Sequence, residues 1–285
     1  MTIVYDEFKA LKMPDAEQVI TDREVMHYAL SVGMGEDPMD RDEQPYVFEK
    51  NLKTIPTITT AIAWEDGWIF KSGINATMVV HGEQWLTMHR PFPAAAHVLA
   101  TNRVLDIFDK GADKGAVILV EREMSDKNSG EKIATLIMSI MARGDGGFGG
   151  PKGSGPAPHQ VPDTEPDAVF DYKTSVRQAL YYRLNGDRNP LHADPDFAAA
   201  GGFDRPILHG LCSYGIACRA VLKTFCDHDH TKLTGFDVRF SAPVIPGETL
   251  RTEMWRDGDV VSYRMRAVER DVVVLKNGKA TIGGF

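Results

Sequence analysis

The stretch Tyr182-Arg183-Leu184-Asn185-Gly186-Asp187-Arg188-Asn189-Pro190-Leu191-His192-Ala193-Asp194-Pro195 places one acid and one imidazole five residues apart. Side chains at that spacing do not share a helical face, where neighbours lie three or four residues apart. Pro190 also disfavours helix at Asn189, and residues 186–190 are typical of a turn. We therefore expect Asp187 and His192 to lie on a bent loop after a short helix, where their side chains can converge.

A carboxylate and an imidazole that meet at one water molecule can move protons near neutral pH. The same residues also have a simpler interpretation, because an aspartate in such a turn is often a local cap and a single histidine is often only packed. Asp187 and His192 are thus the candidate catalytic pair, with a purely structural role as the alternative.

A second string, Pro206-Ile207-Leu208-His209-Gly210-Leu211-Cys212-Ser213-Tyr214-Gly215, follows the first. In order and separation, residues 182–195 and 206–215 resemble the two motifs of hydratase 2, the MaoC-like (R)-specific enoyl-CoA hydratases. The resemblance extends over nearly the whole chain, and its specificity is concentrated in residues 182–215. It implies an α+β double hot-dog fold, in which each half wraps a curled antiparallel sheet around a helix.

The resemblance implies hydration of a trans-2-enoyl-CoA to (R)-3-hydroxyacyl-CoA, in fatty-acid or steroid side-chain β-oxidation. Asp187 and His192 match the family's catalytic pair and are assigned jointly, because coupled groups titrate as a unit. Asn189 matches a position that orients the site, with a plain turn residue as the alternative. Gly210 matches a backbone oxyanion donor, since the start of a helix has free N–H groups; the alternative is a glycine that only permits a tight turn.

Other polar residues near the motifs are expected to be structural. His209 is better suited to support than to catalysis, and Asp194 is expected to cap the turn that begins at Pro195. Cys212 is interpreted as a small buried hydrophobe, with a nucleophile as the alternative. No metal site is predicted, because residues 226–230 (Cys-Asp-His-Asp-His) are interpreted as a polar turn, although such spacing can also bind zinc.

Local patterns predict the order of the elements. A helix is expected over residues 22–32, capped by Thr21 or Asp22, and the interval 57–68 receives no assignment. Residues 171–184 are predicted as a strand leading into a helix, with Val176, Ala179, Leu180 and Leu184 at helical spacing, and a long apolar helix is expected at 208–225. Strands are predicted at 78–91, 96–109, 115–125, 133–142, 233–241, 249–257, 260–269 and 271–282, with a polar hairpin loop at 126–131 and a tight turn at Asn277-Gly278.

The two halves of the chain resemble each other. Residues 28–30 (Tyr-Ala-Leu) match residues 182–184 (Tyr-Arg-Leu), and residues 82–93 resemble residues 235–246. The first half has Gly35-Glu36-Asp37-Pro38 in place of the loop that carries His192, and it shows no long apolar helix. Only the second half is therefore expected to carry the site.

This duplication predicts three segments. Residues 1–143 form a degenerate N-terminal hot-dog domain that opens room for the acyl chain, and residues 167–285 form the catalytic domain. Residues 144–166, rich in glycine and proline, are interpreted as a linker that is not a packed element. A phosphate-binding loop is disfavoured there, because no strand-to-helix context with a Lys-Ser or Lys-Thr ending follows.

The amino-acid composition limits the classes of partner and the compartment that we expect. The 285 residues are 43% hydrophobic and 25% charged, as in ordinary soluble globular proteins, and the net charge of -8 gives no footprint for nucleic acid. Cys212, Cys218 and Cys226 lack Cys-x-x-Cys spacing, which favours reduced thiols in the cytoplasm. Neither a membrane span, a secretory signal nor a peroxisomal address is expected.

The expected ligand is an acyl-CoA thioester. Coenzyme A is part of that substrate, so no separate cofactor is expected, and the residues that contact it are not assigned. A homodimer is implied by resemblance alone, because hot-dog sheets commonly pair. Two alternatives to the hydratase stay open: a hot-dog acyl-CoA thioesterase and a non-catalytic acyl-CoA-binding subunit.

Overall fold

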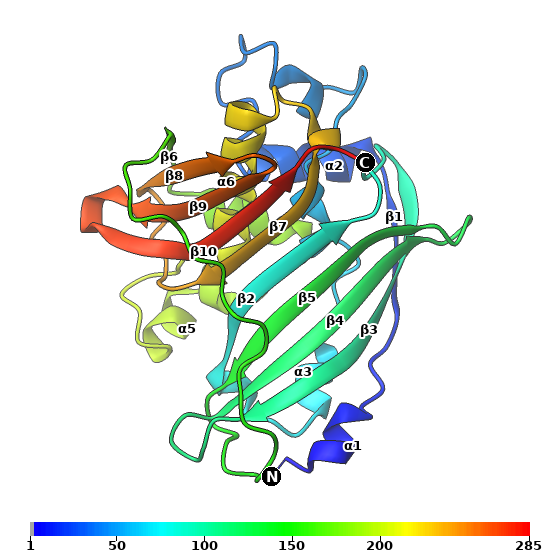
Figure 1. The fold of residues 1–285 in the computed structure, drawn as a ribbon, viewed down its shortest axis with the longest axis vertical. Helices are drawn as coiled ribbons and strands as arrows, with labels where there is room; N and C mark the ends of the chain where they lie inside the picture. Colours follow the sequence, from blue (N-terminus) through cyan, green and yellow to red (C-terminus); the bar gives the residue numbers. More distant parts are fainter. Residues whose placement is uncertain (1–2) are drawn as a thin grey trace.

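The computed structural model describes residues 3–285, and within them all ten strands join one antiparallel sheet (Figure 1). The strands are β1 Ala16–Ile20, β2 Val79–Met88, β3 Ala96–Asp109, β4 Ala116–Asp126, β5 Lys132–Ala142, β6 Ala168–Lys173, β7 Leu233–Phe240, β8 Thr249–Asp257, β9 Val260–Ala267 and β10 Val272–Ile282. Their order across the sheet is β1-β3-β4-β5-β2-β7-β10-β9-β8-β6. The antiparallel α+β class predicted from the sequence is confirmed.

The sheet is built from two copies of one five-strand pattern. The order β1-β3-β4-β5-β2 in the first half corresponds, strand for strand, to β6-β8-β9-β10-β7 in the second. The two copies join at the centre of the sheet, where β2 pairs with β7 and Glu83 lies opposite Arg239. The matching order confirms that the halves are repeats.

The helices gather on one side of this sheet (Figure 1). The α-helices are α1 Tyr5–Lys9, α2 Asp22–Ser31, α3 Gly67–Lys71, α4 Gln178–Tyr182, α5 Pro195–Ala200 and α6 Gly210–Phe225. The short 3-10 turns are η1 Gln44–Tyr46, η2 Pro56–Thr60, η3 Ala76–Met78, η4 Arg183–Asn185, η5 Pro190–His192, η6 His230–Lys232 and η7 Val268–Arg270. No helix in the described part of the chain is long and apolar enough to span a membrane.

The predicted helices at 22–32 and 208–225 are both present. α2 starts at a capping box, in which the Glu24 carboxylate accepts the N–H of Thr21 at 2.8 Å. α6 is buried over most of its length and contacts β6, β7, β8 and β10, as an apolar helix inside a curled sheet should. The two halves differ here, since η1 and η2 provide only short turns in the first half and η2 itself contacts α6.

The eight predicted strands are confirmed with small shifts at their ends. The tight turn predicted at Asn277-Gly278 is wrong, because both residues lie inside β10. The register against β7 shifts between Lys276 and Lys279, and Asn277 has a left-handed φ of 57°. The Asn-Gly pair therefore forms a bulge, which uses the same left-handed backbone as a hairpin turn.

The helix predicted before the motif is shorter than expected. β6 ends at Lys173, and α4 with η4 covers only Gln178–Asn185. Of the four apolar residues at helical spacing only Ala179 is buried, whereas Val176, Leu180 and Leu184 are exposed. The buried side of α4 is instead formed by Gln178, Ala179 and Tyr182.

Residues 144–166 contain neither helix nor strand, as predicted, but the expectation that they do not pack is wrong. The Asp109 carboxylate accepts the N–H groups of Gly147 and Gly149, both at 2.7 Å. Further along, the His159 ring lies 2.8 Å from the Ser262 hydroxyl. The segment thus crosses the face of the sheet opposite the helices, in front of the strands in Figure 1.

Candidate active site

The motif loop owes its shape to turn chemistry. Gly186, at the end of η4, has a φ of 152°, and a Cβ there would lie 2.7 Å from the carbonyl oxygen of Ala61. The Asn189 side chain caps η5 by accepting the N–H of Leu191 at 3.0 Å. Asp194 caps α5 as predicted, because its Oδ1 accepts the N–H groups of Asp196 and Phe197.

The bent loop brings Asp187 and His192 together, as the sequence predicted. One side-chain ligand atom from each, together with one from His209, lies within 4.8 Å of the others. The backbone N–H of Asn189 donates to Asp187 Oδ1 at 3.0 Å and helps to orient the carboxylate. The Asn189 side chain caps the turn, and its predicted role in orienting the site stays a prediction. The catalytic roles themselves stay a prediction.

His192 has one ring nitrogen free. Its Nδ1 lies 2.9 Å from the carbonyl oxygen of Ile207, which can only accept, so Nδ1 carries the hydrogen and Nε2 keeps a lone pair. Burial lowers the pKa of His192 below its usual value; the Asp187 charge raises this pKa and the Arg183 charge lowers it further. A neutral imidazole with a free lone pair is suited to accept a proton near pH 7.

His209 contacts both members of the pair. Its ring stacks on His192 with centroids 3.7 Å apart, and its Nε2 lies 3.3 Å from the backbone oxygen of Asp187. Burial, reinforced by His192, lowers the pKa of His209 to about 2, so the ring stays neutral. The geometry agrees with the predicted supporting role. In the sequence, this role was indicated only by the position of His209 directly before the predicted helix.

Gly210 is the first residue of α6 and is exposed. The first N–H groups of a helix have no partner within it, and they lie at the positive end of the helix dipole. Gly210 follows His209 directly, so α6 begins next to the residue that stacks on His192. A Cβ at this position would lie 3.0 Å from the Phe240 ring, so a close approach also favours glycine.

The structure describes the surroundings of Cys212 and of residues 226–230, for which two interpretations were weighed. Cys212 is fully buried, and burial raises its thiol pKa well above the usual value, which argues against a nucleophile. Residues 226–230 form the expected turn, with Asp227 and His228 in left-handed conformations and Asp229 capping η6.

Among the described residues, three side chains that could ligate a metal lie together at the two motifs. Asp187, His192 and His209 are close enough for an ion, a possibility that the sequence did not suggest. His192 Nδ1 and His209 Nε2 each face a backbone carbonyl, and the two rings are tilted by only 27°. Because imidazole lone pairs lie in the ring plane, stacked rings direct them side by side rather than at one ion. The arrangement fits proton transfer better than a tetrahedral zinc site.

Residues of α2 in the first half contact the segment that leads into the motif loop. The sequence did not indicate these contacts. His27 Nδ1 lies 2.9 Å from Asn185 Oδ1, and the Asn185 amide donates to the Ser31 hydroxyl at 2.9 Å. The rings of Tyr28 and Tyr182, which occupy matching positions of the two copies, are 6.1 Å apart. The repeat therefore places α2 against the helix that leads into the motif loop.

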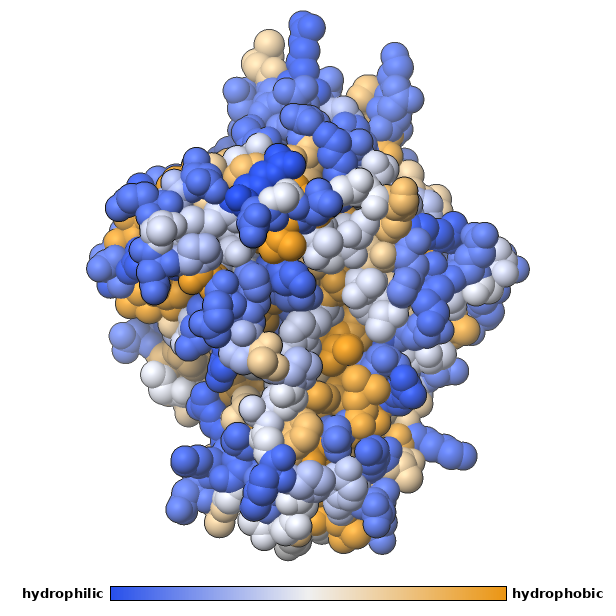
Figure 2. Space-filling model, viewed as in Figure 1, coloured by the Kyte–Doolittle hydropathy of each residue, from blue (hydrophilic) through white to orange (hydrophobic). Residues whose placement is uncertain are grey.

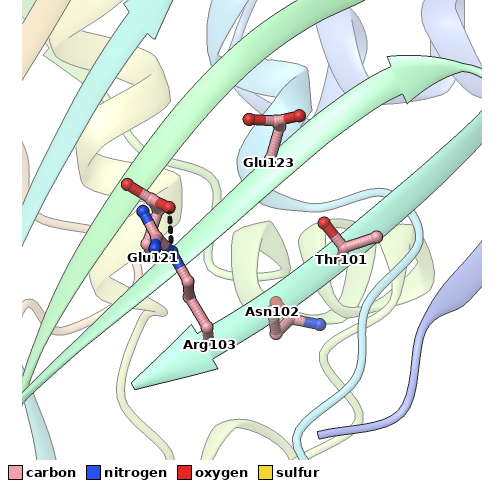
Figure 3. Close-up of a pocket in the computed structure, with 5 residues that line it drawn as sticks. All are labelled: Thr101, Asn102, Arg103, Glu121 and Glu123. Carbon is pink, nitrogen blue, oxygen red and sulfur yellow. Dashed lines mark hydrogen bonds and ion pairs between the residues drawn. The ribbon is translucent and has the colours of Figure 1, made fainter. Parts of the chain in front are cut away.

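Two hollows lie on the opposite face of the sheet. The larger, of about 480 Å³, runs between the strands and residues 156–159, and its floor includes the apolar residues Leu105, Leu119 and Ile137. Figure 2 shows an apolar region on this face, surrounded by hydrophilic surface. The smaller hollow is lined by Thr101, Asn102, Arg103, Glu121 and Glu123 (Figure 3). Neither is lined by Asp187, His192 or Gly210.

Comparisons with known proteins agree with this architecture. Residues 19–144 match the MFE-2 hydratase 2 N-terminal domain, and residues 158–278 match the MaoC like domain. The 3-hydroxyacyl-thioester dehydratase Y of Mycobacterium tuberculosis is 41% identical over 239 residues, which cover 83% of this chain and 82% of that protein. The chain belongs to the MaoC-like hydratase 2 family.

Other members of the MaoC-like hydratase 2 family are similar over their whole length. The enoyl-CoA hydratase ChsH3 of Mycobacterium tuberculosis is 38% identical over 287 residues, 98% of each chain. The crystal structure of a MaoC-like dehydratase from Phytophthora capsici superposes with a TM-score of 0.87 at 30% identity, covering 98% of this chain and 99% of that one. The fold is a double hot-dog.

Proposed function

We propose that this chain hydrates trans-2-enoyl-CoA thioesters to (R)-3-hydroxyacyl-CoA and catalyses the reverse dehydration. The observation that carries the proposal is the meeting of Asp187 and His192 beside the start of α6 in a chain of the hydratase 2 family. The enzyme is a hydro-lyase, and its place is in fatty-acid or steroid side-chain β-oxidation.

The reaction needs two kinds of group. As water attacks carbon 3 it must lose a proton, and carbon 2 must gain one; Asp187 and His192 jointly hold the water and exchange these protons. The thioester oxygen gains enolate character, and the exposed N–H of Gly210 at the positive end of α6 stabilises that charge. His209 stays neutral and keeps the His192 ring in place.

The proposal assigns the acyl chain to the N-terminal half, residues 1–143. The difference that supports this assignment is that the second half has the long helix α6, whereas the first half has only short turns.

A homodimer and a cytoplasmic location complete the proposal. Leu30 of α2, Leu180 of α4 and Leu184 of η4 are each about half exposed, on elements that contact one another, and a second copy would bury them. Cys212, Cys218 and Cys226 are buried free thiols, which suits a reducing compartment. Light scattering with Leu180→Asp tests the dimer, since the variant should be monomeric; an unchanged mass would refute this surface.

The activity is tested with crotonyl-CoA and longer enoyl-CoA esters up to a sterol side chain. The absorbance of the conjugated enoyl thioester should disappear, and the product should be oxidised by an (R)-specific dehydrogenase alone. An (S) product, release of free thiol, or no turnover at any chain length would overturn the proposal.

A further inference from the structure

Arg122 is a buried cation in the half that lacks the motif. It lies on β4 with a 3% exposed fraction, and its guanidinium donates to the backbone oxygens of Ile62, at 2.7 Å, and Ala63. Within residues 3–285 it forms no ion pair with a carboxylate. A buried charge without a countercharge is costly, so these two carbonyl groups are its main compensation.

The carbonyl groups that Arg122 binds belong to a turn held from two sides. Ala63 has a left-handed φ of 46°, which is unfavourable for alanine, and its N–H donates to Gln18 Oε1 at 2.6 Å. Gln18 lies on β1 and Arg122 on β4, so two first-half strands hold the turn in this conformation. We call residues 61–64 the buttress turn.

The buttress turn meets the motif loop directly. A Cβ on Gly186 would lie 2.7 Å from the Ala61 oxygen and 3.3 Å from the Trp64 Cβ, so there is no free space between the two segments. Gly186 immediately precedes Asp187. A shift of the buttress turn therefore moves the backbone that carries the carboxylate.

We propose that Arg122 is a positioning residue for the active site in the other half: it fixes the buttress turn, which in turn fixes Gly186 and Asp187. The inference rests on the proposed hydratase function. Arg122 touches neither member of the pair; it acts through two carbonyl groups and one glycine. Misplacing a reacting group by about 1 Å can cost 100-fold in rate, so a loosened turn has a measurable effect.

The test compares Arg122→Met with Arg103→Met as the matched control. Arg103 lies on the neighbouring strand β3, and its exposed side chain pairs with Glu121 at 2.5 Å on the opposite face (Figure 3). Arg122→Met should lower kcat for crotonyl-CoA by about 10- to 100-fold with little change in KM, and Arg122→Lys should recover part of the loss. Arg103→Met should retain the wild-type kcat.

Two further measurements separate positioning from general destabilisation. Gly186→Ala disturbs the contact between the motif loop and the buttress turn from the loop side. The fold-reduction in kcat of the double variant with Arg122→Met should therefore be smaller than the product of the two single reductions. If Arg122→Met does not fold, Gln18→Ala, which removes one bond to the buttress turn, should reduce kcat in the same direction. A folded Arg122 variant with unchanged kcat, or fully multiplicative losses with Gly186→Ala, would overturn the proposal.

A readout without turnover keeps this inference separate from the proposed reaction. The ring signals of His192, assigned in the NMR spectrum with His192→Gln, should shift in Arg122→Met and stay in place in Arg103→Met. If the wild-type chain hydrated no enoyl-CoA but these signals shifted, the proposed reaction would fail and the positioning role would stand. Unshifted signals in a folded Arg122→Met would refute the positioning role.

Discussion

The two halves of this molecule share one strand order but differ in the loop and helix that the strands hold. In the second half, α6 fills the curled sheet and the motif loop brings Asp187 to His192. In the first half, short turns replace the long helix, and the corresponding loop carries Asp37, whose exposed carboxylate accepts the N–H of Met39. The two halves therefore share a scaffold, whereas the chemistry depends on the motif loop and on the start of α6.

Removal of the His192 imidazole should have the largest effect on the activity of the second half. His192→Gln should lower kcat for enoyl-CoA hydration by about 10²- to 10⁴-fold, because proton transfer by a positioned side chain contributes that much. Asp37→Asn, in the corresponding loop of the first half, should leave kcat unchanged. Steady-state kinetics of both variants check the asymmetry; equal losses would mean that both loops take part.

The next largest effect should come from the connection between the halves. Glu43 of the first half and Arg219 of α6 form a buried pair with two contacts of 2.9 Å. Glu43→Ala leaves the guanidinium buried and unpaired, so the free energy of unfolding should fall by about 3–5 kcal/mol. Denaturant unfolding measures this loss. Glu121→Ala, at the exposed pair with Arg103, should cost less than about 1 kcal/mol.

Acid should destabilise the second half through its buried imidazoles. The folded-state pKa of His209 is about 2, whereas an unfolded histidine has a pKa of about 6.5. The unfolded state therefore binds more protons below pH 6.5, and stability is lost as the pH falls below that value. The contribution of His209 should be about 1.4 kcal/mol per pH unit, and His209→Phe should reduce the slope by that amount. An unchanged slope in denaturant titrations at pH 4–6.5 would contradict the buried neutral ring.

The smallest effect concerns a feature of β10 alone. β5, its counterpart in the first half, contains no Asn-Gly pair, whereas Asn277 in β10 has a φ of 57°. Asn277→Val should lower the unfolding free energy by about 1–2 kcal/mol, because a branched residue is unfavourable in the left-handed region. Lys276→Val, at an exposed neighbouring position, should leave the unfolding free energy nearly unchanged. Thermal unfolding of both variants would show whether the left-handed conformation at position 277 favours asparagine over valine.

Local patterns in the sequence were sufficient for most of the sheet and for the motif loop. Local patterns predicted eight strands, and Gly186 and Pro190 predicted a bent loop, because turn chemistry depends on neighbouring residues. The same local patterns wrongly predicted a tight turn at Asn277-Gly278, which lies inside β10. An Asn-Gly pair requires a left-handed backbone, and both a hairpin turn and a bulge provide one.

The contacts that support the site could not be predicted in this way, because they join distant parts of the chain. The stack of His209 on His192 depends on where α6 begins relative to the loop. Arg122 lies in a strand, where alternation alone cannot show that a charged residue points inward to bind the carbonyl groups of the buttress turn. The exposure of Leu180 and Leu184 likewise depends on which side of α4 faces α2.

The role of Asp187 is measured by two quantities on the Asp187→Asn variant: kcat for crotonyl-CoA and the Kd of saturated butyryl-CoA. We expect kcat to fall by about 1,000-fold or more while Kd stays within about twofold, and adding His192→Gln should cost little further because the pair acts as a unit. An Asp187→Asn variant that hydrates crotonyl-CoA near the wild-type rate would show that Asp187 is not a catalytic residue.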